Sequence, residues 1–269
     1  MGNCESKIRT MSNYLRSRIN SDIQFTRYLY EKTEVKLAFM ISLLRHTDEC
    51  LFWGYELLHS GFLVELIELF WSIYYDFYAS LNPTFEKYLT NKIQIMISNT
   101  KKRDKTLAII VNNFMIRPYT LDVFIMRHFI KHFEFDRTYI LNYKNSGEYD
   151  KAKIEIISML EIEDYLMLSS LIFDEIEESH LLQTLETILD FFKDLGPKYK
   201  KDQILAKYKT IVDSKSTFKR VILYSQMIHY FTVRKKINMG KKLYVQVEDE
   251  ELLLYDTINF DLNDKKKYI

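Results

Sequence analysis

Apolar residues along the chain recur at three- and four-residue spacing, which is the period of a helix with one buried face. This spacing predicts a helix from Thr33, which is expected to cap it, to about His46. Residues 62–81 are apolar almost all round, so we predict a buried core helix there. Further helices are predicted at residues 47–60, 82–100, 105–117, 120–133, 137–145, 149–177, 179–194, 199–212 and 216–236.

Short connections between these segments favour antiparallel neighbours. We therefore predict an all-α fold of stacked antiparallel helix pairs, similar to HEAT repeats, although no repeated motif is visible. Residues 243–247 alternate between apolar and polar, and residues 252–255 are apolar, which predicts a small C-terminal β-hairpin. The expected organisation is an N-terminal segment (1–20), a helical domain (21–240) and a C-terminal β element with a tail (241–269).

Composition agrees with a helical protein. The chain of 269 residues has only six glycines and three prolines, and Gly61 stands where a helix is expected to end. Two cysteines cannot form a disulfide framework or a four-cysteine zinc site. The core helix at 62–81 carries three carboxylates, so no transmembrane span is expected.

Charge is distributed unevenly, although the formal net charge is only +1. Residues 151–194 hold three basic and eleven acidic side chains, whereas residues 198–242 hold thirteen basic and two acidic ones. Cations interleaved with aromatic residues are typical of a surface that binds RNA, DNA or anionic lipid. The alternative is that these cations cover helices packed beside the acidic segment. The candidate binding residues are Lys198, Lys200, Lys201, Lys207, Lys219, Arg220, Arg234, Lys235, Lys236, Lys241 and Lys242.

The N-terminus fits the motif for myristoylation of Gly2, with Ser6 at the position that prefers serine or threonine. One acyl chain binds a membrane only marginally, and palmitoylation of Cys4 or nearby cations would supply the second signal. Translation from Met11 would remove this anchor, and that alternative stays open.

Other candidate chemistry is weaker. His128 and His132 are four residues apart on one predicted helix, a spacing that suits a metal ion, but neighbouring cations oppose one. Glu65, Glu68 and Asp76 form a polar stripe with Tyr75 that suits acid and base chemistry, although a solvated helix edge explains it as well. No phosphate-binding loop, dinucleotide motif or catalytic triad signature is present, so we predict no cofactor, and enzymatic activity has no support in the sequence.

Two resemblances concern the segment around residues 48–62, which contains Leu51-Phe52-Trp53 and Leu57-Leu58. Together with residues 73–83 it resembles uncharacterised proteins of nucleocytoplasmic large DNA viruses over about residues 25–90. It is also similar, more weakly, to the helical collar of replication-associated AAA+ proteins of the recombination factor A type. The ATPase domain of those proteins is absent from this sequence. The first resemblance implies a viral protein in the cytoplasm of an infected cell, and the second implies a helix pair used in assembly.

From these observations we predict a non-enzymatic scaffold or protein-interaction protein, tethered to a cytoplasmic membrane if its N-terminus is acylated. The alternative is a nucleic-acid-binding accessory factor in viral replication, transcription or translation that uses the basic surface at 198–242.

Overall fold

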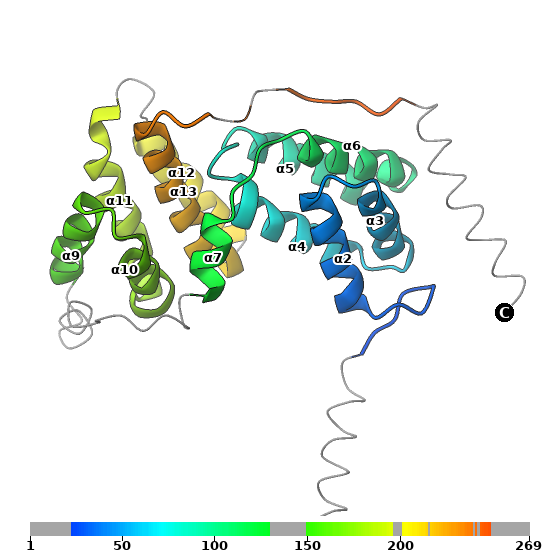
Figure 1. Ribbon diagram of the computed structural model, residues 1–269, viewed down its shortest axis with the longest axis horizontal. Coiled ribbons are helices and arrows are strands. Elements are labelled where there is room, and N and C mark those ends of the chain that lie inside the picture. The colour runs from blue at the N-terminus through cyan, green and yellow to red at the C-terminus, as the bar shows by residue number, and fades with distance from the viewer. Residues whose placement is uncertain are drawn as a thin grey trace, which may run out of the picture. The chain divides into compact units, whose positions relative to one another are not determined.

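The computed structural model describes residues 23–129, 149–195, 201–214, 216–238, 240 and 243–248. These residues form an all-α protein, as predicted, and contain no β-strand beyond an isolated antiparallel bridge between Phe25 and Glu31 (Figure 1). The α-helices are α2 (Lys32–Leu44), α3 (Glu49–His59), α4 (Leu63–Ile73), α5 (Phe85–Ser98), α6 (Arg103–Met115), α7 (Asp122–Phe129), α9 (Tyr149–Glu161), α10 (Tyr165–Ser170), α11 (Leu181–Phe191), α12 (Lys201–Ser214) and α13 (Lys219–Arg234).

Shorter helical turns link several of these helices. Residues Tyr74–Tyr78 continue α4 as a π-helical turn, and Leu171–Glu175 continue α10 in the same way. Turns of 3₁₀ helix lie at Thr100–Lys102, Glu178–His180, Lys193–Leu195 and Ser216–Phe218.

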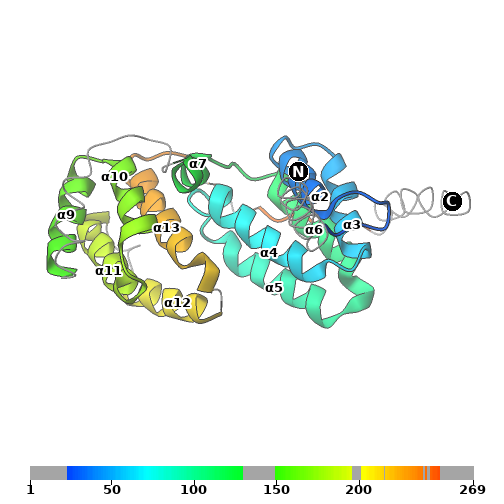
Figure 2. The same ribbon diagram turned by 90° about the horizontal axis from the view of Figure 1, so that it is seen from below.

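The described chain divides into two compact units. Unit 1 comprises residues 23–69, 91–116 and 244–248, and unit 2 comprises residues 70–90 and the described residues from 117 to 243. In unit 1, α2 and α3 lie side by side and both contact α6 (Figures 1 and 2). In unit 2, α13 packs on α7 and α11, and α11 also contacts α9 and α12.

Gly54 lets the helices of unit 1 approach closely. A β-carbon at this position of α3 would lie 3.1 Å from Cε2 of Phe39 on α2 and 3.3 Å from Cδ1 of Leu107 on α6. Gly61 has a positive φ of 86° just after α3, which is the usual position of a helix-ending glycine and confirms that assignment.

Two expected elements differ from the structure. The predicted helix over 149–177 is interrupted between α9 and α10, where Glu163 takes a positive φ of 55° that no helix accommodates. The hairpin is not confirmed: Val245 pairs its amide and carbonyl with the Asn113 carboxamide rather than with a strand, and residues 252–255 lie outside the described chain. HEAT-like stacking stays a prediction.

Replacing Gly54 with valine should destabilise the protein by about 1–3 kcal/mol, because Phe39 and Leu107 leave no room for a branched side chain. Urea unfolding followed by circular dichroism measures this change. Leu37→Val, at an exposed position of α2, is the matched control and should leave the midpoint almost unchanged. Equal midpoints for Gly54→Val and the wild type would contradict the close packing.

Candidate functional site

A short loop precedes α2 and displays apolar side chains; we call residues 23–31 the apolar loop. It is closed by its own backbone, since the amide of Thr26 donates to the carbonyl of Tyr30 at 2.8 Å and the amide of Leu29 donates to the carbonyl of Thr26 at 2.9 Å. The Thr26 hydroxyl also accepts the amide of Tyr30 at 3.2 Å. At the end of the loop, the Glu31 carboxylate caps α2 by accepting two first-turn amides at 2.9 and 3.1 Å. The loop therefore has a defined conformation.

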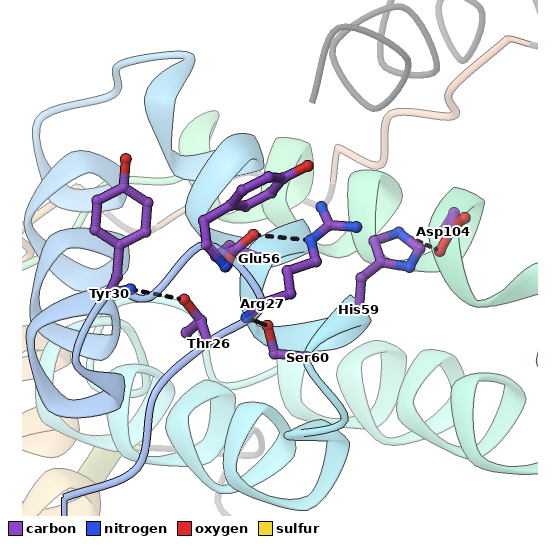
Figure 3. A network of polar contacts seen from close by, with 8 residues as sticks. Thr26, Arg27, Tyr30, Glu56, His59, Ser60 and Asp104 are labelled. Atoms are coloured by element: carbon purple, nitrogen blue, oxygen red, sulfur yellow. Dashed lines mark hydrogen bonds and ion pairs between the residues drawn. The ribbon is translucent and has the colours of Figure 1, made fainter. Parts of the chain in front are cut away.

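The buried carboxylate of Glu56 fastens the apolar loop to α3 (Figure 3). Glu56 is fully buried, and its Oε2 accepts a hydrogen bond from Nε of Arg27 at 3.0 Å. Its Oε1 accepts the backbone amide of Tyr28 at 3.1 Å. A buried carboxylate is unfavourable unless it is paired and hydrogen-bonded, and here both oxygens have partners. The sequence positions joined in this way are 28 and 29 residues apart.

Neighbouring groups complete this anchor. The Ser60 hydroxyl at the end of α3 accepts the amide of Arg27 at 2.9 Å. The Arg27 guanidinium also lies 4.8 Å from the centre of the Tyr28 ring, close enough for a cation–π contact. Burial raises the pKa of Tyr28 above its ordinary value. Farther along α3, His59 turns toward Asp104 of α6, 3.4 Å away (Figure 3).

Four apolar side chains of the apolar loop are exposed. Ile23, Phe25, Leu29 and Tyr30 expose 50, 56, 72 and 42% of their surface, respectively. The ring of Tyr30 leans edge-on against Trp53 of α3, with 5.4 Å between ring centres. Clustered apolar side chains at a surface indicate a contact with another molecule more often than scattered ones do.

Leu29 occupies a backbone conformation that disfavours leucine. Its φ of 65° is left-handed, a region that glycine and asparagine enter readily and that costs other residues roughly 1–2 kcal/mol. Its side chain is also the most exposed of the four apolar ones, so burial does not compensate this cost. Strain of this kind persists where the surroundings impose it, and it is concentrated at functional sites.

Several cations of the predicted basic surface pair with the acidic segment at 151–194. Lys201 lies 2.6 Å from Asp190 and 3.1 Å from Glu186, and Lys219 lies 2.8 Å from Glu178. These bonds raise the pKa of Lys201 above its usual value and lower that of Glu178.

Three more of these cations, Lys235, Arg220 and Arg234, contact other groups of unit 2. Lys235 bonds to Glu163, and Arg220 donates to the backbone carbonyls of Ile172 and Ile176, the latter at 2.6 Å. The guanidinium of Arg234 lies 4.9 Å from the ring centres of Phe191 and Phe192. Lys236 is exposed. The other predicted positions, Lys198, Lys200, Lys241 and Lys242 and the side chain of Lys207, lie outside the described part of the chain.

Asp76 and Glu65, two members of the acidic stripe, form structural pairs. Asp76 is buried, and both of its oxygens lie 2.9 Å from Nη1 of Arg127 on α7. Burial raises the pKa of Asp76, while the Arg127 guanidinium acts in the opposite direction. Glu65 pairs with Lys32 at 3.4 Å. Asp76 therefore joins α7 to the π-helical turn.

Of the candidate metal ligands and lipidation sites, only His128 lies among the described residues. His128 packs its ring 4.6 Å from that of Phe124, and burial lowers its pKa, whereas His132 lies outside the described residues. Within the described ranges, no three histidine, cysteine or acidic side chains gather as metal ligands would. Gly2 and Cys4 also lie outside these ranges.

Comparison of the chain with protein-family models, with curated proteins and with solved structures finds no match. Among the described residues, no helix combines the length and the apolar character needed to cross a bilayer.

No pattern in the sequence distinguishes the apolar loop. The pairing of Arg27 with Glu56 joins distant positions and leaves no periodic pattern, and Glu56 lies among apolar residues of a helix that otherwise looks like core. That isolated carboxylate was the one available signal, because a charge on a buried helix face requires a partner.

Glu56→Ala should destabilise the protein by about 3–5 kcal/mol, because it leaves the Arg27 guanidinium and the Tyr28 amide without their acceptor. Denaturant unfolding of Glu56→Ala, Arg27→Ala and the double variant measures this loss and the coupling between the two side chains. The double variant should lose less than the sum of the single losses.

Glu65→Ala is the control for this cycle, since its pair with Lys32 is partly exposed and should contribute no more than about 1 kcal/mol. Strictly additive losses for Glu56→Ala and Arg27→Ala would refute the anchor.

Proposed function

We propose that this chain is an interaction protein of the scaffold type, without catalysis of its own, and that it contacts its target through the apolar loop. The observation that supports this function is the exposed, strained Leu29 on a loop fastened by Glu56. A preorganised loop loses less conformational freedom on binding than a mobile one, so the anchor favours recognition.

The charges of unit 2 support the same class of function. Three of the cations that can be located, Lys201, Lys219 and Lys235, pair with carboxylates of the acidic segment. Ion pairs of this kind leave fewer cations to meet a phosphate backbone. We therefore favour interaction through the apolar loop over the alternative of nucleic-acid binding at residues 198–242.

Two expectations from the sequence, acylation of the N-terminus and a resemblance to viral proteins, extend this proposal. Acylation of Gly2, with Cys4 as a second site, would tether the chain to a cytoplasmic membrane. The resemblance of residues 25–90 to proteins of large DNA viruses would place it in the cytoplasm of an infected cell, where a scaffold brings other components together.

Replacing Phe25 with aspartate should remove the bound target, because it puts a charge into the contact while Glu56 still holds the loop. The measurement is quantitative co-purification, of proteins, nucleic acid and lipid, with tagged wild-type and Phe25→Asp chains from infected cells. We expect a protein, nucleic acid or lipid that co-purifies with the wild type to be lost with Phe25→Asp and retained with Ile154→Asp. Ile154 is the control because 70% of its surface is exposed.

Identical material with both variants would contradict the proposal. Recovery of RNA or DNA that falls steeply with salt, and that Arg234→Glu, Lys235→Glu and Lys236→Glu together abolish, would favour the nucleic-acid alternative instead.

A further inference from the structure

Leu29 contributes little to the fold of unit 1. It sits at the left-handed position of a closed turn, where asparagine or glycine would be relaxed, and 72% of its surface is exposed. The backbone bond from its amide to Thr26 would be retained by either residue. A leucine that strains its backbone without becoming buried points to a contact outside the chain.

The size of the apolar loop indicates what kind of target it contacts. Stable protein partners usually bury roughly 20–30 residues on each side. The loop offers four exposed apolar side chains, those of Ile23, Phe25, Leu29 and Tyr30. A lipid surface requires less area, because a few apolar side chains can enter it while the rest of the protein stays in water.

The types of side chain agree with a lipid surface. Aliphatic Ile23 and Leu29 suit the acyl region, whereas Tyr30 and its neighbour Trp53 carry rings with one polar group. Such amphipathic rings are favoured at the boundary between acyl chains and head groups.

The sequence directly before the loop has matching chemistry. Residues 1–22 contain four basic side chains and two acidic ones, Glu5 and Asp22, and apolar residues recur among them at positions 8, 11, 15 and 19. Basic segments with interspersed apolar residues are typical of chains that bind anionic lipid. The cations outnumber the acidic side chains in this part of the sequence, which favours an anionic target for the neighbouring loop.

We propose that the apolar loop inserts into an anionic lipid membrane, with Leu29 and Phe25 entering the acyl boundary. This inference rests on the proposed function, since it names the target of that loop. It requires no acyl group on Gly2.

The test uses full-length, unacylated protein and two kinds of vesicle, phosphatidylcholine alone and phosphatidylcholine mixed with phosphatidylserine. Sedimentation with vesicles measures binding for the wild type, Leu29→Asn and Ile162→Asn. Ile162 is the matched control, because it is exposed to 71% in unit 2. Thermal unfolding of each variant measures stability separately.

We expect the wild type to bind the vesicles that contain phosphatidylserine and to bind phosphatidylcholine alone much more weakly. Leu29→Asn should bind the charged vesicles about tenfold more weakly, the effect of losing one inserted aliphatic side chain. It should nevertheless unfold at the same or a higher temperature than the wild type, because asparagine relaxes the turn. Ile162→Asn should bind like the wild type.

Absence of vesicle binding by the wild type at low salt would overturn the inference, as would equal binding by Leu29→Asn. If the wild type ignores vesicles while Phe25→Asp loses a protein from co-purification, then the inference fails and the proposed function stands. If neither assay depends on the loop, both fail.

Discussion

The arrangement of the apolar loop depends on the two hydrogen bonds that the Glu56 carboxylate accepts from Arg27 and Tyr28. This carboxylate is fully buried on α3 and satisfies a guanidinium and a backbone amide of a segment nearly thirty residues earlier. Without this acceptor, Arg27 and the amide of Tyr28 would lose the two hydrogen bonds that fasten the loop to α3. The anchor therefore explains how a loop with an exposed apolar outer side keeps one conformation, and why Leu29 stays in a left-handed backbone.

Charge pairing organises unit 2 in a different way. Its acidic segment and its basic helices are consecutive in the sequence, and five of the located cations, Lys201, Lys219, Arg220, Arg234 and Lys235, contact carboxylates, carbonyls or rings of the same unit. Each exposed pair contributes little alone, so the effect is mainly to satisfy charge between packed helices. The acidic and basic segments, whose charges nearly cancel in the sequence, are thus also paired with each other in the structure.

The sequence predicted the helices well and the apolar loop not at all. Periodic burial is a local property, so the all-α class and most helices, α5 and α6 among them, could be predicted from spacing and from Gly61. The interruption at Glu163 could not, since a left-handed residue with a charged side chain interrupts a pattern that otherwise continues. The loop depends on a contact between Arg27 and Glu56 that only tertiary structure creates.

Amide hydrogen exchange at Tyr28 tests the central claim most directly. This amide lies in a surface loop, where exchange is normally fast, but its hydrogen bond to buried Glu56 should protect it as strongly as amides within α3. Protection at Tyr28 that disappears in Glu56→Ala, while the amides of α11 stay protected, is the predicted result. Fast exchange at Tyr28 in the wild type would contradict the account.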